Sequence, residues 1–347
     1  MSMSSETPQS VPAHLIERNK GLWTTQETPD WHELDKEKDF IISGSAFIDL
    51  NDPLGRKGNP FTVVTGSGVG TLTGEAKDQI ALKTGTPETV FINDCSLSSE
   101  QGEVPSYELG LTVKTPTGKE LGACAHGFTG AVQTLLELGT VISPSVITIA
   151  TTMQTGSRAL ISEERIISLE FMLSEARSII IDAQSVSDIF GVEVGKDKSP
   201  YQVLSVGSPK LTIEVTEDQF NAVQQNLDCL DYDALSTLQN ENQINGIHLF
   251  CRDEKGLPAK VIQANAYLGR ENVVDPATGV SCAAQVGSDT SVKEGETVKL
   301  TQYTAKGPSA DLYVTKKDDG IVLVGGTAVL FNFEEINPIE PKKEDLP

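Results

Sequence analysis

The 347-residue sequence is poor in positive charge and in aromatic side chains. Lys and Arg number 27 against 49 Asp and Glu, so the formal net charge is -22, and aromatic residues make up 5%. A surface of this charge repels phosphate backbones and anionic lipid headgroups. We therefore expect no nucleic-acid partner and no membrane partner. An acidic surface also keeps many proteins soluble, so the charge excludes partners without naming one.

Long apolar runs and paired cysteines are also lacking. The first 20 residues are polar, unlike a secretory signal, and no apolar run reaches the roughly 18 residues of a membrane span. The five cysteines are odd in number, widely spaced and without a Cys-x-x-Cys pair, which argues against a disulfide framework or a zinc site. We expect a soluble, cytoplasmic protein with reduced thiols and no bound metal.

Motifs for cofactors and for common catalytic machinery are missing as well. The sequence has no Gly-rich dinucleotide motif after a strand, no phosphate loop, no Gly-x-Ser-x-Gly elbow and no His-Glu-x-x-His helix. Chemistry without a cofactor is the expectation that remains.

The length and the pattern of short strands favour two lobes. A chain of 347 residues suits two domains, and 30 glycines with 38% hydrophobic residues suit many short strands and turns. Residues 1–37 are predicted to form a partly disordered extension and 336–347 a tail. We assign 38–146 with 321–335 to an N-terminal lobe and 147–320 to a C-terminal lobe.

Strand-like runs and a few helical patterns recur in both halves. Apolar helical segments are predicted at 127–138 and 276–286, and a more polar one at 75–83. Strands are predicted at 40–47, 61–65, 89–92, 109–114, 146–151, 166–173, 178–181, 203–206, 211–215, 247–251, 261–267, 297–302, 310–315 and 321–331. Each half then has several strands and one apolar helix, which predicts two similar lobes.

Two segments place polar side chains at the start of an apolar helix. They are Ala123–Ala131 (ACAHGFTGA) and Asp275–Ala284 (DPATGVSCAA). A helix start carries unpaired N–H groups and the positive end of the helix dipole, so two facing starts would hold a carboxylate without Lys or Arg. Asp275 followed by Pro276 is also an ordinary helix cap, which needs no function.

Three residues in or near these segments and strands are candidates for chemistry. Glu88 precedes an apolar strand, and burial there would suit a carboxylic acid to general acid/base work; an exposed loop glutamate is the alternative. His126 is one of four histidines, and a histidine at a helix start is also a common capping or packing residue. Cys124 would be a nucleophile or acid/base at a lobe interface, and otherwise a small buried hydrophobe.

Taken in order, several segments resemble the PhzF-like (phenazine-biosynthesis) family, which has the diaminopimelate-epimerase fold. The resemblance covers about residues 38–333, and no single motif decides it. The matching pieces are Gly58–Val64 (GNPFTVV), Gln79–Ala81 with Pro87–Phe91 (PETVF), Val113–Gly118, the segment of Cys124 and His126, Asp275–Gly279 (DPATG) and Val324–Val329 (VGGTAV).

The resemblance implies an α+β fold of two pseudo-symmetric lobes, each a β-barrel-like sheet around a central helix, with the active site in the cleft between them. It also implies a homodimer. By the same resemblance Glu88 shuttles a proton on a small unsaturated carboxylate, and His126 and Asp275 assist. The implied substrate-binding residues are Asn59, Cys124, Gly127, Phe128, Thr278, Gly279, Val280 and Ser281.

Some residues depart from the family pattern. Val280 and then Ser281 follow Gly279, where the family usually has Ser directly, and Gly127-Phe128 replace the usual Pro-Thr after the histidine. Pro276 stands where the related two-cysteine racemases carry their second thiol, which disfavours a two-thiol racemase.

The function predicted from the resemblance and the residues together is that of a cofactor-independent isomerase of a small carboxylated metabolite. A lyase, hydratase or cyclase on the same scaffold, or a non-catalytic binding protein, is the alternative.

Overall fold

The fold is described from a computed structural model of the whole chain. It describes residues 34, 38–48, 58–99, 104–153, 155–195, 200–270, 273–326 and 328–336. The predicted extension (1–37, apart from Leu34) and the predicted tail (336–347, apart from Ile336) lie outside these residues.

Strands dominate the described part of the chain, as the sequence predicted. The first group is β1 (Asp39–Ala46), β2 (Asn59–Thr65), β3 (Glu88–Ser99), β4 (Ser106–Lys114), β5 (Ser145–Thr151), β6 (Thr155–Ile161) and β7 (Ile167–Met172). The second group is β8 (Arg177–Ile179), β9 (Tyr201–Leu204), β10 (Lys210–Glu214), β11 (Ile247–Arg252), β12 (Pro258–Ala264), β13 (Val274–Asp275), β14 (Thr297–Thr304), β15 (Gly307–Lys316), β16 (Ile321–Gly326) and β17 (Ala328–Ile336). The strands β6 and β13 were not predicted, and the single strand predicted at 321–331 is divided between β16 and β17.

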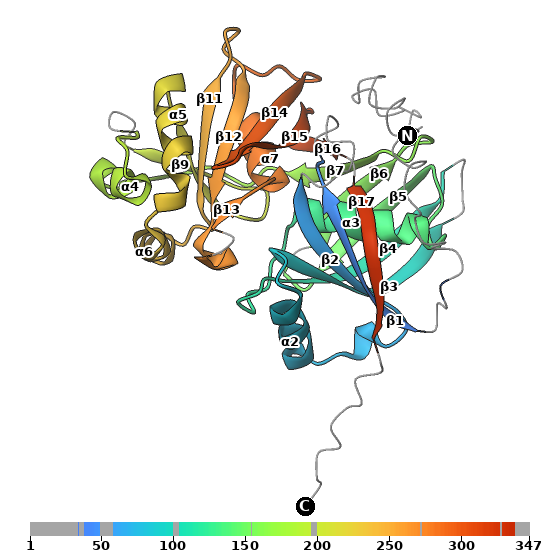
Figure 1. Cartoon of the computed structure of the whole chain (residues 1–347). Coiled ribbons are helices and arrows are strands. Elements are labelled where there is room, and N and C mark those ends of the chain that lie inside the picture. Colours follow the sequence, from blue (N-terminus) through green and yellow to red (C-terminus); the bar gives the residue numbers. More distant parts are fainter. Residues whose placement is uncertain are drawn as a thin grey trace, which may run out of the picture.

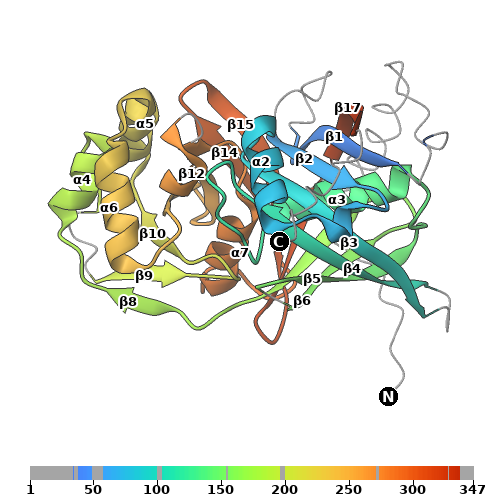
Figure 2. The same cartoon turned by 90° about the horizontal axis from the view of Figure 1, so that it is seen from below.

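The strands pair in one continuous order through both halves of the molecule. From one end the order is β17–β1–β2–β3–β4–β5–β6–β7, and β7 then pairs with β16. From β16 it continues as β15–β14–β12–β11–β10–β9–β8, with β13 beside β12. The junction between β7 and β16 joins two lobes that lie side by side in both views (Figures 1 and 2).

The two halves repeat one pattern of strand directions. From β1 to β7 successive pairs are antiparallel, parallel, antiparallel, parallel, antiparallel and antiparallel. The series β9, β10, β11, β12, β14, β15, β16 has the same six directions in the same order. The predicted pseudo-symmetry is therefore confirmed. The exact lobe boundaries remain a prediction.

One apolar helix lies inside each lobe, at the same place in each repeat. The helix α3 (Ala125–Glu137) connects β4 to β5, and α7 (Gly279–Ser288) precedes β14. All 13 residues of α3 and nine of the ten in α7 are buried, because both helices consist largely of small and apolar side chains. Both helices contribute to one hydrophobic core. The two central helices were predicted, with α7 starting three residues later than expected.

The remaining helices cover the outer faces of the sheets. In the first lobe this helix is α2 (Gly74–Thr84), which was predicted. In the second lobe they are α4 (Ala183–Phe190), α5 (Glu217–Asn226) and α6 (Tyr232–Asn242), which lie on its outer side (Figure 1). These three pack with β9–β12 into a second core. Three short 3₁₀ turns complete the secondary structure of the described residues: η2 (Val69–Thr71), η3 (Leu227–Cys229) and η4 (Ala266–Leu268).

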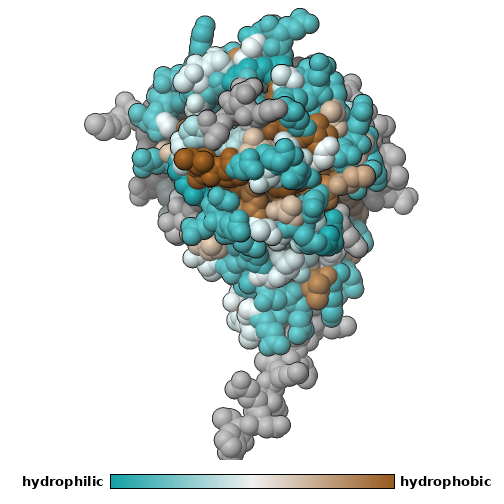
Figure 3. All heavy atoms as spheres, turned by 90° about the vertical axis from the view of Figure 1, so that its left-hand side faces the viewer, coloured by the Kyte–Doolittle hydropathy of each residue, from teal (hydrophilic) through white to brown (hydrophobic). Residues whose placement is uncertain are grey.

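The outer surface of the second lobe is mostly hydrophilic, with a group of hydrophobic side chains across it (Figure 3). Within the described part of the chain, no helix has the combination of length and apolar character that crossing a membrane requires.

Candidate active site

Glu88 is the first residue of β3, next to the central helix of its lobe. The preceding turn leaves α2 through Gly85, whose φ of +65° is a left-handed conformation that favours glycine. Parallel pairing then sets Glu88 beside Phe61 of β2. The side chain is buried, with a residue exposure of 3%, so the alternative of an exposed loop glutamate is wrong.

The start of α3 brings two polar side chains beside Glu88. Cys124 is the N-cap residue in an extended conformation, and His126 lies in the first turn. Gly127 allows this packing, because a Cβ there would lie 2.8 Å from Val90 Cγ2 and 3.0 Å from Cys124 Sγ. A larger residue would displace the thiol or the strand.

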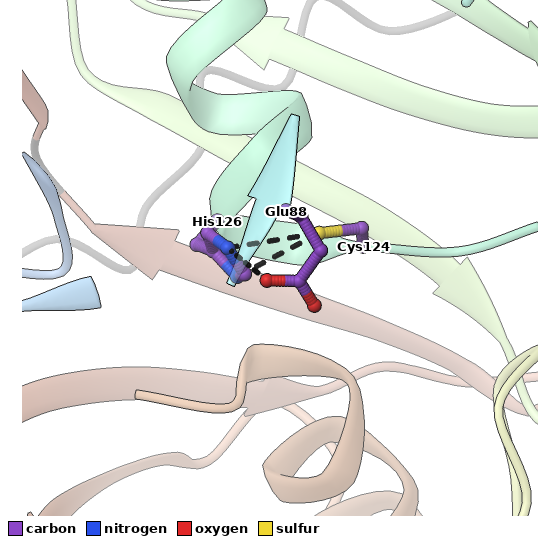
Figure 4. A group of neighbouring side chains, drawn as sticks. All are labelled: Glu88, Cys124 and His126. Atoms are coloured by element: carbon purple, nitrogen blue, oxygen red, sulfur yellow. Dashed lines mark hydrogen bonds and ion pairs between the residues drawn. The ribbon is translucent and has the colours of Figure 1, made fainter. Parts of the chain in front are cut away.

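Glu88, Cys124 and His126 form a buried cluster (Figure 4). The Nε2 atom of His126 lies 2.8 Å from Glu88 Oε2, which is a short charge-assisted contact. Cys124 Sγ lies 3.6 Å from Nδ1 and 3.9 Å from Nε2 of the same ring. The cluster therefore joins an acid, a base and a thiol at the end of one central helix.

Asp275 reaches this cluster from the other lobe through Asn59. Asn59 Nδ2 lies 2.7 Å from Asp275 Oδ1, 2.7 Å from the Ala277 carbonyl oxygen and 3.1 Å from His126 Nδ1. An amide has two hydrogens, so the two shorter contacts use both of them. Asp275 Oδ1 also accepts from the Ala277 N–H at 3.1 Å. Asn59 therefore hydrogen-bonds to Asp275 and Ala277 of the other half, and its Nδ2 lies next to His126 without a hydrogen left to donate to the ring.

The start of α7 is held in place by β14. Gln302 Oε1 accepts from the Thr278 N–H at 2.7 Å, and its Nε2 contacts the Asp275 carbonyl oxygen and Thr278 Oγ1. Thr278 is the N-cap residue of α7. The interpretation of Asp275 as the helix cap is therefore wrong, because Asp275 lies in β13 and its carboxylate accepts from Asn59 and Ala277 instead.

The two central helices begin against each other. A Cβ on Gly279 would lie only 2.5 Å from Ala125 Cβ, so glycine is needed for this approach. Neither N-cap side chain, of Cys124 or of Thr278, caps its helix with a hydrogen bond. Both helix starts point their positive ends toward the junction, as the sequence predicted.

Burial and mutual charge shift the site's ionisable groups. Burial lowers the pKa of His126, but Cys124 and Glu88 outweigh it, so the pKa lies well above the ordinary value. Burial and the Glu88 charge raise the pKa of Asp275, against the opposing effect of His126. Burial raises the pKa of the Cys124 thiol. The short contact between His126 and Glu88 therefore favours an imidazolium–carboxylate pair.

The other predicted binding residues have different surroundings. Phe128 is fully buried and stacks on Phe171 of β7, with ring centroids 6.5 Å apart, so it belongs to the hydrophobic core. Val280 and Ser281 are buried in the first turn of α7. Among the described residues, Asn59 Oδ1 and Ser281 Oγ are buried polar atoms without a hydrogen-bond partner. Such atoms are suited to receive a ligand.

The cluster also has donors that could hold a metal ion. Glu88, Cys124 and His126 each offer one ligand atom, and the three atoms lie within 4.8 Å of one another. A carboxylate, a thiolate and an imidazole are ligands that zinc accepts. The donors are already paired with one another at the distances given above, which also fits a proton-transferring group.

Several residues around Asp275 were not predicted as part of the site. They are Lys210, Gln263, Asn265, Tyr267 and Gln302, all within or next to strands of the second lobe. Asn265 is the polar residue of the mostly apolar run 264–268 (ANAYL), which is a weak signal, whereas Lys210 follows Ser208 and Pro209 and carries no such signal.

No family model and no curated protein matches this sequence, but solved structures do. A PhzF-family phenazine biosynthesis protein of Bacillus anthracis is 22% identical, with a TM-score of 0.63 over 86% of this chain and 99% of its own. The chain has the PhzF fold. A predicted epimerase of Pseudomonas aeruginosa is 19% identical, with a TM-score of 0.62 over the same shares of the two chains, 86% and 99%.

The PhzF fold extends to an enzyme that acts on an amino acid. A hydroxyproline epimerase from Agrobacterium vitis, solved with trans-4-hydroxy-L-proline, is 13% identical, with a TM-score of 0.56 over 87% of this chain and 91% of its own. The predicted diaminopimelate-epimerase-like architecture is thereby confirmed.

Proposed function

We propose that the protein is a cofactor-independent isomerase that moves a proton within a small carboxylated metabolite. The observation that carries the proposal is the buried pair of Glu88 and His126, 2.8 Å apart and linked through Asn59 to Asp275 of the other lobe. An acid and a base in direct contact, away from water, are the parts that general acid/base catalysis needs.

Glu88 is the proton carrier in this proposal. As a carboxylate it takes a proton from a carbon of the substrate, and as the acid it returns a proton to another position. One C–H bond breaks and one forms, so the substrate keeps its mass and no electron acceptor is needed. His126 holds the carboxylate in place and balances its charge, and Asp275 fixes Asn59 against the imidazole ring.

The substrate carboxylate is assigned to the meeting point of the two helix starts. The N-terminal N–H groups of α3 and α7 are not capped by side chains of Cys124 or Thr278, and helix N-termini bind anions. Asn59 Oδ1 and Ser281 Oγ lack partners among the described residues and would bind the substrate's donor groups. Such local donors would let a protein of charge -22 bind an anion.

The structural neighbours support the same class of reaction. Two of them are named as epimerases, which are isomerases, and one of these was solved with an amino acid, which carries a carboxylate. Within this class the two-thiol mechanism is disfavoured here, because Pro276 stands where the two-cysteine racemases carry their second thiol, and Glu88 is then the better proton carrier. A homodimer, which the family resemblance implies, is proposed for the assembly, and light scattering would check it.

A lyase, hydratase or cyclase on the same scaffold is the alternative function. It rested on a more apolar pocket formed by Phe128 and Val280, but Phe128 packs into the core against Phe171. The mass of the product separates the two, because isomerisation conserves it and dehydration does not.

The test is solvent deuterium exchange followed by mass spectrometry. Wild type and Glu88→Gln are incubated in D₂O with a panel of unsaturated and amino carboxylic acids. The proposal expects label uptake by the wild type without other change of mass, and a loss of about 10²–10⁴-fold in the variant. Equal uptake by the two proteins would refute the role of Glu88.

A further inference from the structure

The second lobe buries a lysine near Asp275. Lys210 is the first residue of β10 and is 1% exposed. Within the described part of the chain it makes no ion pair, in contrast to Lys114, which pairs with two acids. A buried ammonium group needs compensation from neighbouring polar groups or charges, so its surroundings call for an explanation.

Three polar atoms surround the amine of Lys210. Its Nζ lies 2.5 Å from the Asn245 carbonyl oxygen, 3.1 Å from Asn265 Oδ1 and 3.1 Å from the Tyr267 hydroxyl. The Tyr267 ring centroid lies 4.9 Å from the same atom. Both Asn oxygens can only accept, so Lys210 donates to both of them.

Asn265 passes this contact on to Asp275. Its Oδ1 accepts from Lys210 and, at 2.6 Å, from Gln263 Nε2, while its Nδ2 donates to Asp275 Oδ2 at 3.2 Å. Two donors on the oxygen fix the orientation of the amide. If the amide turned over, its oxygen would face a carboxylate and its NH₂ group would face an ammonium. Lys210 therefore selects the orientation that donates to Asp275.

We propose that Lys210 is a positioning residue of the isomerase site, which orients Asn265 toward Asp275 and supplies the positive charge that favours the ionised aspartate. This role rests on the proposed function, in which Asp275 acts as an anion. The groups from Asn59, Ala277 and Asn265 that contact its oxygens are donors, and the Thr278 side chain also hydrogen-bonds to the carboxyl group and favours its ionised form.

Charged and titratable groups approach Asp275 from five elements. They are Glu88 on β3, His126 on α3, Lys210 on β10, Tyr267 on η4 and Cys282 on α7. Burial lowers the pKa of Lys210 to about 7, although Asp275 and Glu88 act to raise it. Burial likewise raises the pKa of the Tyr267 hydroxyl and of the Cys282 thiol, which keeps both groups neutral. Lys210 and His126 are then the two positive charges that oppose Glu88.

The experiment follows the titration of Asp275 itself, which needs no substrate. The protein is labelled with [4-¹³C]aspartate, and the Asp275 signal is assigned by its loss in Asp275→Asn. Titrations between pH 4 and 9 are then compared for the wild type, Lys210→Met and Lys255→Met. Methionine fills a similar length without a charge, and Lys255 is an exposed lysine of the same lobe.

In Lys210→Met the midpoint of Asp275 should rise by about one pH unit, a tenfold change in its protonation. In Lys255→Met it should not move. Coincident titrations of wild type and Lys210→Met would overturn the proposal. If Lys210→Met does not fold, Asn265→Ala removes the link while Lys210 stays, and the midpoint should again rise.

The activity assay separates this role from the function on which it rests. If the wild type exchanges deuterium, Lys210→Met should shift the acid limb of the pH profile upward by the same unit, whereas a merely structural loss would lower exchange equally at every pH. If the wild type exchanges no compound but the Asp275 midpoint still moves, the proposed function fails while the coupling of Lys210 to Asp275 stands.

Discussion

Asn59 makes the most direct connection between the two lobes at the site, so replacing it should weaken the folded state strongly. The change considered is Asn59→Leu, which keeps a similar volume and removes the amide. Asn59 is 0% exposed, and its Nδ2 donates to Asp275 Oδ1 and to the Ala277 carbonyl oxygen, each at 2.7 Å. Both acceptors would stay buried without this donor.

The expected loss follows from these two bonds. A hydrogen bond to a charged group contributes about 1.5–3 kcal/mol and a neutral one about 0.5–1.5 kcal/mol. The free energy of unfolding should therefore fall by about 2–4 kcal/mol. Part of this loss depends on the charge of Asp275, so in an Asp275→Asn background the same change should cost about 1 kcal/mol less.

Urea unfolding followed by circular dichroism measures both values. Asn332→Leu, at an exposed position on β17, is the control and should change the unfolding free energy by less than about 0.5 kcal/mol. A loss below about 1 kcal/mol for Asn59→Leu, or an equal loss in the two backgrounds, would refute the bridging role of Asn59.

Three further variants test other parts of the account. In the unfolded wild type, Lys210 keeps its proton up to its ordinary pKa of 10.5, whereas in the folded protein it loses the proton near pH 7. The unfolded state therefore binds more protons between these two pH values, and the free energy of unfolding rises with pH there. Urea unfolding at a series of pH values should show that the free energy of unfolding of the wild type rises relative to that of Lys210→Met by up to about 1.4 kcal/mol per pH unit. The same pH dependence in the two proteins would contradict this prediction. Cys124→Ser should keep exchange activity within about tenfold, since Glu88 carries the proton; a loss as large as that of Glu88→Gln would instead assign the proton to the thiol. Gly279→Ala should destabilise the fold by about 1–3 kcal/mol in thermal unfolding, because its Cβ would lie 2.5 Å from Ala125 Cβ, and an unchanged melting temperature would contradict the contact between the helix starts.

The sequence predicted the parts of the fold that depend on local pattern. The apolar segment after Cys124 was recognised as a buried helix, and all 13 residues of α3 are buried. The helices α4 to α6 were missed although each begins at a capping side chain, of Asp182, Thr216 and Asp231, and buries one face against the second core.

The candidate site was predicted in its chemistry but not in its connections. The segments of Glu88, His126 and Asp275 were identified, and the structure brings the first two into contact and links the third through Asn59. Lys210 and Asn265 were not identified as site residues, because their contacts with each other and with Asp275 join separate stretches of the chain. Such pairing of distant residues cannot be derived from spacing in a single sequence.

The most direct test of the central claim is deuterium uptake from D₂O by wild type and Glu88→Gln on the same panel of small carboxylic acids. The account predicts uptake by the wild type, without any other change of mass, and a loss of about 10²–10⁴-fold in the variant while its unfolding curve stays close to that of the wild type. Uptake that is unchanged in Glu88→Gln, or a product of different mass, would contradict a proton-shifting isomerase that uses this glutamate.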